Sequence, residues 1–310
     1  MTWDPLQATQ FKGCLLGLAL GDALGAPHEG GPLERLLWRL LGTTKDGKIR
    51  WTDDTQMSLD LAESLCENDR LVPEDVALRF ASSYRWSRGY GPGAAKLLKR
   101  IRKGQPWQQA NRAVFRDGSY GNGGAMRAPV IGMFCAARPK DLPQIAHDSA
   151  RITHAHPLGL EGALLIASSV AKALNCAAPL EILSSATSVC REQPFLDKLS
   201  IAQEWLETGN LPTPSEVAAQ LGYGMAAKDS CVTALFLGLA FLDKPFTELL
   251  TFVAQTQGDV DTIGAMAGAI WGAVHGAENL PAEKLRTLEQ LGRLTSASQA
   301  LFTAACRDLE

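Results

Sequence analysis

Two runs of glycine, each repeating every fourth residue, constrain the fold of this chain more than any other feature. The runs are Gly13, Gly17, Gly21 and Gly25, and then Gly264, Gly268, Gly272 and Gly276. On an α-helix, this spacing keeps the glycines of each run near one face. A glycine inside a helix costs about 1 kcal/mol relative to alanine, so a repeated run is expected only where another element approaches the backbone closely. Both segments are therefore predicted to be central, tightly packed helices, and contact between the two would meet this condition.

Helical periodicity extends over most of the chain. Apolar residues recur at spacings of three and four in residues 11–24, 54–66, 73–86, 94–103, 157–175, 179–190, 195–208, 214–220, 232–241, 246–254, 262–276 and 281–291. Strand-like alternation is nearly absent, and no linker rich in glycine and serine divides the sequence. We predict an all-α fold in which residues 1–310 form a single compact multi-helix domain.

Charge and hydropathy exclude several classes of protein. The chain has 30 basic and 33 acidic side chains, a formal net charge of −3, which argues against a nucleic-acid-binding surface. Its most apolar windows are about a dozen residues long, too short to span a bilayer, and the N-terminus lacks the pattern of a signal peptide. The seven cysteines are scattered and form no Cys-x-x-Cys pair, which favours free thiols in a reducing compartment. We therefore expect a cytoplasmic protein with no membrane or nucleic-acid partner.

Two short acidic segments each precede a predicted helix. The first is WTDDTQ at residues 51–56, and the second is GDVDT at residues 258–262. One interpretation is helix capping, with Thr52 or Asp53 as the N-cap and Gln56 closing a capping box on Asp53. The other is a joint site for hard cations, because oxygen ligands suit Mg²⁺ or Mn²⁺ better than zinc. Together the segments offer four carboxylates and two hydroxyls, which is the inventory of a two-metal site, and we favour this second interpretation.

Three further segments carry candidate functional residues. The loop at residues 117–127, DGSYGNGGAMR, is dense enough in glycine to form an anion-binding nest, although a plain turn is the better explanation of this loop by itself. His154, in THAHP at residues 153–157, is either a donor to a substrate or a core histidine, and His156 lies near a helix cap. Glu29 follows the first glycine run and Pro27, on a loop that could gate a metal site or supply a general base; a solvated glutamate is the alternative.

In order and wording, these segments resemble the ADP-ribosylglycohydrolase family over nearly the whole chain. The matching stretches are GCLLGLALGDALGAPHE, WTDDTQMSLDLAESL, GSYGNGGAMRAPVIG, ARITHAHPLGLEGALLIA and GDVDTIGAMAGAIWGAVHG. The resemblance implies an all-helical fold with a central cleft that holds two divalent cations, usually Mg²⁺ and in some members Mn²⁺, and receives ADP-ribose. It also implies metal ligands at Thr52, Asp53, Asp54, Asp259, Asp261 and Thr262.

The same resemblance implies residue roles around the metals. Glu29 would assist catalysis, and Asp53 or Asp54 could also accept the proton of the attacking water. ADP-ribose would be held by Gly118, Ser119, Tyr120, Gly121, Asn122 and His154. The expected substrate is ADP-ribose attached to a protein side chain or a small acceptor, with an O-linked serine bond slightly preferred over an N-linked arginine bond. The alternatives are a weakly catalytic ADP-ribose-binding protein and a two-metal nucleotide phosphohydrolase. Since all the motifs lie in one chain, we expect a monomer.

Overall fold

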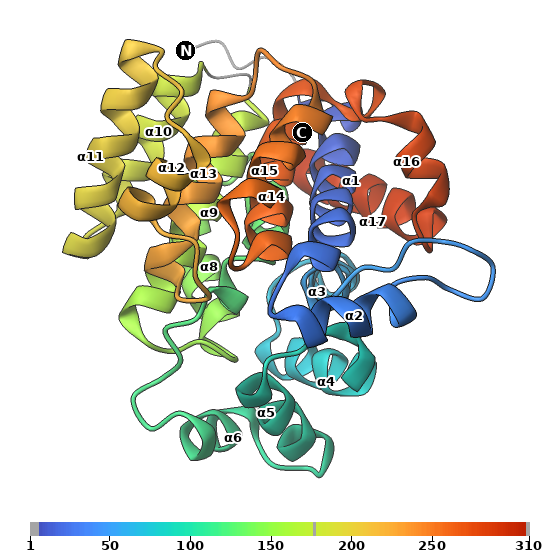
Figure 1. Cartoon of the computed structure of the whole chain (residues 1–310). Helices are drawn as coiled ribbons and strands as arrows, with labels where there is room; N and C mark the ends of the chain where they lie inside the picture. The colour runs from blue at the N-terminus through green and yellow to red at the C-terminus, as the bar shows by residue number, and fades with distance from the viewer. Residues whose placement is uncertain (1–5, 176–177, 308–310) are drawn as a thin grey trace.

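The molecule is built from α-helices (Figure 1). This computed structural model describes residues 6–175 and 178–307. The α-helices are α1 (Ala8–Gly25), α2 (Pro32–Leu41), α3 (Asp53–Asn68), α4 (Pro73–Ser83), α5 (Pro92–Arg102), α6 (Trp107–Val114), α7 (Ala128–Phe134), α8 (Leu142–Arg151), α9 (Pro157–Ala173), α10 (Pro179–Val189), α11 (Gln193–Thr208), α12 (Pro214–Leu221), α13 (Cys231–Ala240), α14 (Phe246–Thr256), α15 (Val260–His275), α16 (Ala282–Thr287) and α17 (Leu291–Cys306). Over the described residues, extended pairing is limited to three isolated β-bridges. The all-α prediction is confirmed.

The two glycine helices, α1 and α15, lie side by side in the middle of the molecule (Figure 1). They run antiparallel, so that Gly13 faces Gly272, Gly17 faces Gly268 and Gly21 faces Gly264. A methyl group placed on Gly17 would lie closer than 3.0 Å to the carbonyl oxygen of Gly268. The backbones therefore touch directly, and the predicted close packing is confirmed as a contact between these two helices.

Several other helices pack against this central pair. Helices α13 and α14 pack against α15, and α17 packs against α1. The apolar side chains of all these elements form one buried cluster, which includes Phe11 and Leu18 of α1 and Ile263 and Ile270 of α15. The free energy gained by burying this apolar surface outweighs the low helix propensity of the glycines.

The sequence analysis did not predict five helices: α2, α6, α7, α8 and α17. Helix α7 is buried on every side, so it shows no amphipathic period, and α17 buries mainly alanine, serine and leucine, which weakens its apolar stripe. The predicted helix 281–291 is wrong after Thr287. There the chain turns at residues 288–290 to pair with Ile49, and Gln290 takes a left-handed conformation.

Two other expectations concern the environment of the chain. The six described cysteines form no disulfide with one another, and Cys14, Cys135, Cys190 and Cys231 are buried. Cys176 lies outside the described residues. Across the described parts of the chain, none of the helices has the length and apolar character needed to cross a membrane.

We predict that Gly17→Ala lowers the free energy of unfolding, although alanine is the better helix former. The added methyl group must push α1 and α15 apart, and overpacking of this kind costs about 1–3 kcal/mol. The measurement is equilibrium unfolding in urea. Gly292→Ala in α17 is the matched control, because nothing lies within 4 Å of that position, and it should leave stability unchanged or slightly raised. Equal stability of Gly17→Ala and wild type would contradict the direct backbone contact.

Candidate active site

One cleft collects most of the residues singled out in the sequence. Its volume is about 220 Å³, and its walls come from α3, α15, the glycine-rich loop and the loops that follow α1 and η2 (Trp86–Arg88). The predicted site residues that line it are Glu29, Asp53, Asp54, Ser119, Gly121, Asn122, His154, Asp259, Asp261 and Thr262. Thr52, Gly118 and Tyr120 are not among the residues that line it. The fold therefore brings together segments from the start, middle and end of the chain.

The first acidic segment forms the N-terminus of α3. Thr52 is the N-cap, and its hydroxyl oxygen accepts a hydrogen bond from the backbone N–H of Asp54 at 3.2 Å. The predicted capping box is wrong, because the Gln56 side chain donates to Asp60 at 2.9 Å instead. Capping and cation binding are thus compatible here, since Asp53 and Asp54 remain directed at the cleft.

Asp22 of α1, which the sequence analysis gave no role, holds this segment in place. Its carboxylate accepts hydrogen bonds from the backbone N–H groups of Thr52 at 2.9 Å and Thr55 at 3.0 Å, and from the Thr55 hydroxyl at 2.5 Å. Asp22 is fully buried. The only signal in the sequence was a lone carboxylate within an apolar glycine helix, a position that is costly unless the charge is hydrogen-bonded.

The second acidic segment forms the N-terminus of α15, with Asp259 as the N-cap residue. Carboxylate oxygens of Asp259, Asp261 and Glu29 lie within 4.8 Å of one another. Glu29 reaches this position because α1 ends at Gly25, which packs against the backbone of Asp261. The loop glutamate and the α15 carboxylates therefore face the same point in the cleft.

These carboxylates repel one another. Burial raises the pKa of Asp54 well above its ordinary value, and the carboxylates of Asp22 and Asp53 add to the rise. Burial also raises the pKa of Asp261, with Glu29 and Asp54 as the next causes. Burial likewise raises the pKa of Asp259. Among the described residues, no ion pair joins Asp53, Asp54, Asp259 or Asp261 to a basic side chain.

A hard cation fits this arrangement. One oxygen of Asp54, Oδ2, is buried and has no hydrogen-bond partner within the described structure. The donors are all oxygen atoms, which is the preference of Mg²⁺ and Mn²⁺. A bound cation would supply the missing partner and cancel the repulsion that raises these pKa values.

The glycine-rich loop closes the cleft opposite α3. Asn122 opens a short 3-10 helix, η3 (Asn122–Gly124), and is anchored by hydrogen bonds from its amide nitrogen to Asp259 and to the Ser230 hydroxyl. Asn122 thus holds a predicted metal ligand. Gly118 has a positive φ of 83° and packs against the backbone of His156. Tyr120 is 58% exposed and its ring packs edge-on against His156.

The two histidines differ in role. His156 is the N-cap of α9, and its Nδ1 accepts a hydrogen bond from the backbone N–H of Leu158 at 3.2 Å, as a cap residue should. His154 lines the cleft beneath Gly121 and Gly123. Burial, and then the nearby Arg127 guanidinium, lower the pKa of His154 to about 3, so its ring is neutral at physiological pH.

Phe115 is a cleft residue that the sequence analysis missed. It lines the cleft with Gly91 and Gly93, and a methyl group on Gly93 would collide with its ring. Met225 lines the same space and is 60% exposed. Nothing in the sequence marked these apolar residues, because only the folded chain places them beside the acidic cluster.

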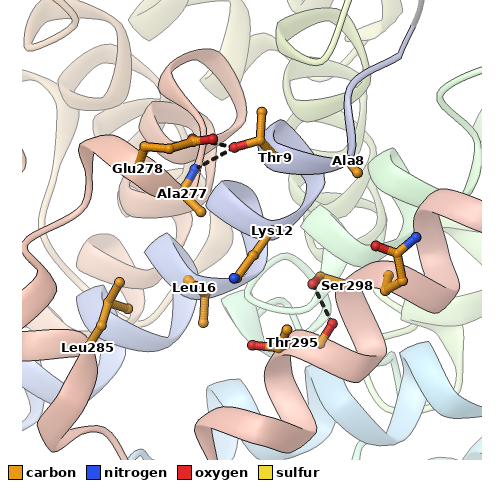
Figure 2. A pocket seen from close by; sticks show the side chains of 10 residues that line it. Ala8, Thr9, Lys12, Leu16, Ala277, Glu278, Leu285, Thr295 and Ser298 are labelled. Atoms are coloured by element: carbon orange, nitrogen blue, oxygen red, sulfur yellow. Dashed lines mark hydrogen bonds between the residues drawn. The ribbon is translucent and has the colours of Figure 1, made fainter.

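A second cavity, of about 420 Å³, lies near the other end of α1. Figure 2 shows Lys12 and Leu16 of α1 and Thr295 and Ser298 of α17 around it. Lys12 and Asp22 are about 15 Å apart along the helix, so this cavity is separate from the cleft. It has Glu278 as its one carboxylate and no glycine-rich loop, so we assign the site to the cleft.

Comparisons with known proteins agree with this assignment. The sequence model of the family described as ADP-ribosylglycohydrolase matches residues 4–309. The chain is 31% identical to ADP-ribosylhydrolase ARH3 of Mus musculus, over 94% of this chain and 91% of that protein. It is 28% identical to the uncharacterized protein YegU of Escherichia coli, over 93% of this chain and 94% of that protein.

A solved structure gives the same result for the fold. It is described as an ADP-ribosylglycohydrolase-related protein complex, and it superposes with a TM-score of 0.72 and 26% identity, over 96% of this chain and 98% of the other. The match therefore extends from sequence motifs to the arrangement of the helices. On this evidence, the chain belongs to the ADP-ribosylglycohydrolase family.

Proposed function

We propose that this chain is a Mg²⁺-dependent hydrolase that cleaves the glycosidic bond between ADP-ribose and an acceptor, with serine preferred over arginine. The observation that carries the proposal is the convergence of two acidic helix N-termini and Glu29 in one cleft, opposite a glycine-rich loop. Family membership supports the hydrolysis of an ADP-ribosyl bond. The single domain, monomeric state and cytoplasmic location expected from the sequence stay predictions.

Six residues would hold two cations: Thr52, Asp53, Asp54, Asp259, Asp261 and Thr262. When bound, Mg²⁺ supplies positive charge that polarises oxygen atoms and makes water more acidic. Asp22 contributes by fixing the backbone of Thr52, and Asn122 by fixing Asp259. These supports keep the ligands in place before any substrate arrives, which lowers the cost of reorganisation during the reaction.

The opposite wall would hold the nucleotide. Ser119, Gly121 and His154 line the cleft where the glycine-rich loop meets α9, and they would hold the phosphates. Phe115 offers an aromatic face within the cleft, suited to stacking on adenine. This arrangement would direct the distal ribose toward the acidic cluster and so place its anomeric carbon beside Glu29.

Glu29 is the candidate proton acceptor. It is half-buried and follows α1 on a loop, beside Asp259 and Asp261. A carboxylate in this position can take the proton of a water that attacks the anomeric carbon, and Asp53 or Asp54 could serve in the same way. The departing acceptor would then leave with a proton returned from the site.

The preference for serine rests on three sequence features: Glu29, the SYGNGGAMR stretch and the THAHPLG stretch. Relatives named ADP-ribosylhydrolase ARH3 include the human protein, which is 31% identical over 88% of this chain and 87% of its own length. An arginine bond, a binding role without turnover and phosphate-bond hydrolysis are the competing outcomes of the first test below.

We predict Mg²⁺-dependent release of free ADP-ribose from a serine-modified peptide, and slower release from a matched arginine-modified peptide. The measurement is chromatography of the products with Mg²⁺ and with EDTA. Faster cleavage of the arginine peptide would contradict the linkage preference. Release of inorganic phosphate would identify a phosphohydrolase, and binding of ADP-ribose with no release from either peptide would identify a binding protein.

We also predict that Asp54→Asn abolishes hydrolysis yet raises the melting temperature of the protein in EDTA. The folded-state pKa of Asp54 is raised, so its ionisation costs stability once the pH exceeds the unfolded value of about 3.9. The gain should grow as the pH rises above this unfolded value and vanish as the pH falls toward 4. Each kcal/mol is worth roughly 2–4 °C in a domain of this size.

The control for this variant is Asp75→Asn, which neutralises a carboxylate paired with Arg79 at 2.7 Å and should bring no gain. Adding Mg²⁺ should stabilise wild type more than Asp54→Asn. A melting temperature that is unchanged or lower in Asp54→Asn at pH 7.5 in EDTA would show that the cluster is not electrostatically strained.

A further inference from the structure

A buried cation lies behind the cleft, and among the described residues no carboxylate pairs with it. The guanidinium of Arg127 is fully buried. It donates hydrogen bonds to the carbonyl oxygens of Gly123 and Ser149, and its Nη2 donates to the Thr153 hydroxyl at 2.9 Å. Its carbon Cζ lies 5.0 Å from the centre of the Phe80 ring. Burying an unpaired charge is costly, so these contacts point to a function for Arg127 beyond packing.

Thr153 connects this cation to the cleft. Its Oγ1 lies 2.8 Å from Nδ1 of His154. Arginine can only donate hydrogen bonds, so Oγ1 accepts from Arg127. Among the described residues the hydroxyl proton of Thr153 has no acceptor other than Nδ1, so we assign it as the donor to Nδ1. His154 is neutral, because burial and Arg127 lower its pKa to about 3. A neutral ring with an acceptor at Nδ1 carries its proton at Nε2.

The Nε2 atom faces the glycine-rich loop. A methyl group placed on Gly123 would lie 2.9 Å from Nε2, and one on Gly121 would lie 3.2 Å from it. Both glycines line the cleft, as does the His154 ring. The glycines therefore leave room for the imidazole ring. The Nε2–H group faces the side of the cleft where phosphates would bind.

We propose that Arg127 and Thr153 are positioning residues that fix His154 as the Nε2–H tautomer, so that it donates a hydrogen bond to a phosphate oxygen of ADP-ribose. The proposal rests on the proposed function for its ligand. The other tautomer would turn a lone pair toward an anionic oxygen and repel it. Because Arg127 donates to Thr153 and Thr153 donates to Nδ1 of His154, that tautomer is disfavoured before the ligand binds.

Arg127 also connects His154 to the glycine-rich loop. Arg127 binds the Gly123 carbonyl as well as Thr153, so one side chain sets both the glycine-rich loop and the histidine behind it. Its charge also lies near enough to the cleft to interact with Asp53. A ligand with phosphates thus meets a wall that is positively polarised, although no described lysine or arginine lines the cleft.

The test compares Thr153→Val, which removes the hydroxyl and keeps the shape, with Thr153→Ser, which keeps the hydroxyl. The first readout is the tautomer of His154 in the ligand-free protein at pH 7, by long-range ¹H–¹⁵N NMR, with the signal assigned by its loss in His154→Asn. We expect Nε2–H in wild type and Thr153→Ser, and a mixture of tautomers in Thr153→Val. We call the hydrogen bonds from Arg127 through Thr153 to His154 the relay. A protonated Nδ1 in wild type would overturn it.

The second readout is the Kd for ADP-ribose by calorimetry. We expect a roughly tenfold weaker Kd in Thr153→Val and the wild-type value in Thr153→Ser, since a hydrogen bond to a charged group is lost only in the former. Thr187→Val is the matched control; its hydroxyl donates to the Leu183 carbonyl of its own helix at 2.9 Å, and neither readout should move. An unchanged Kd in Thr153→Val would overturn the proposal.

The two readouts separate the relay from the proposed function. If wild type shows the Nε2–H tautomer but binds no ADP-ribose, the proposed function and the assigned ligand are both wrong, while the relay itself stands. If wild type binds and cleaves an ADP-ribosyl substrate but shows the other tautomer, the function stands and the relay is wrong. A loss of stability alone, with the tautomer and Kd unchanged, would assign Arg127 and Thr153 to packing.

Discussion

The direct contact between the backbones of α1 and α15 organises the rest of this molecule. Because the two helices run antiparallel, the C-terminal end of α1 meets the N-terminal end of α15, and Gly25 touches the backbone of Asp261. From that end, Asp22 holds the start of α3, and Glu29 follows on the loop after α1. The glycine contact therefore sets the separation between the two acidic segments, and the cleft depends on it.

The electrostatics of the cleft follow from this closeness. Carboxylates that are far apart in the chain become buried neighbours, which raises their pKa values. Within the described part of the chain, Asp54 Oδ2 has no hydrogen-bond partner. The opposite wall has the reverse character, with a neutral His154 and a buried Arg127 behind it. One side of the cleft thus favours cations and the other favours anions, a division suited to a ligand that joins ribose hydroxyls to phosphates.

Sequence reasoning succeeded where the signal was local. The helical period, the glycine spacing and the acidic N-termini depend on residues within a few positions of one another. It failed for α7, whose burial on all sides erases the period, and for the end of the helix predicted at 281–291, where the chain breaks to pair with Ile49. It also gave no role to Asp22, Arg127 or Phe115, because their partners lie far away in the chain.

The sequence by itself determined the all-α class, the two glycine helices and a set of oxygen donors typical of hard cations. Its motifs also indicated the family to which the chain belongs. Only the tertiary structure decided that the glycine helices pair with each other, that Asp22 supports α3, and that Thr153 links Arg127 to His154. The physical reason is that propensity and periodicity act along the chain, whereas burial, charge repulsion and hydrogen-bond direction depend on distances that exist only after the helices have packed.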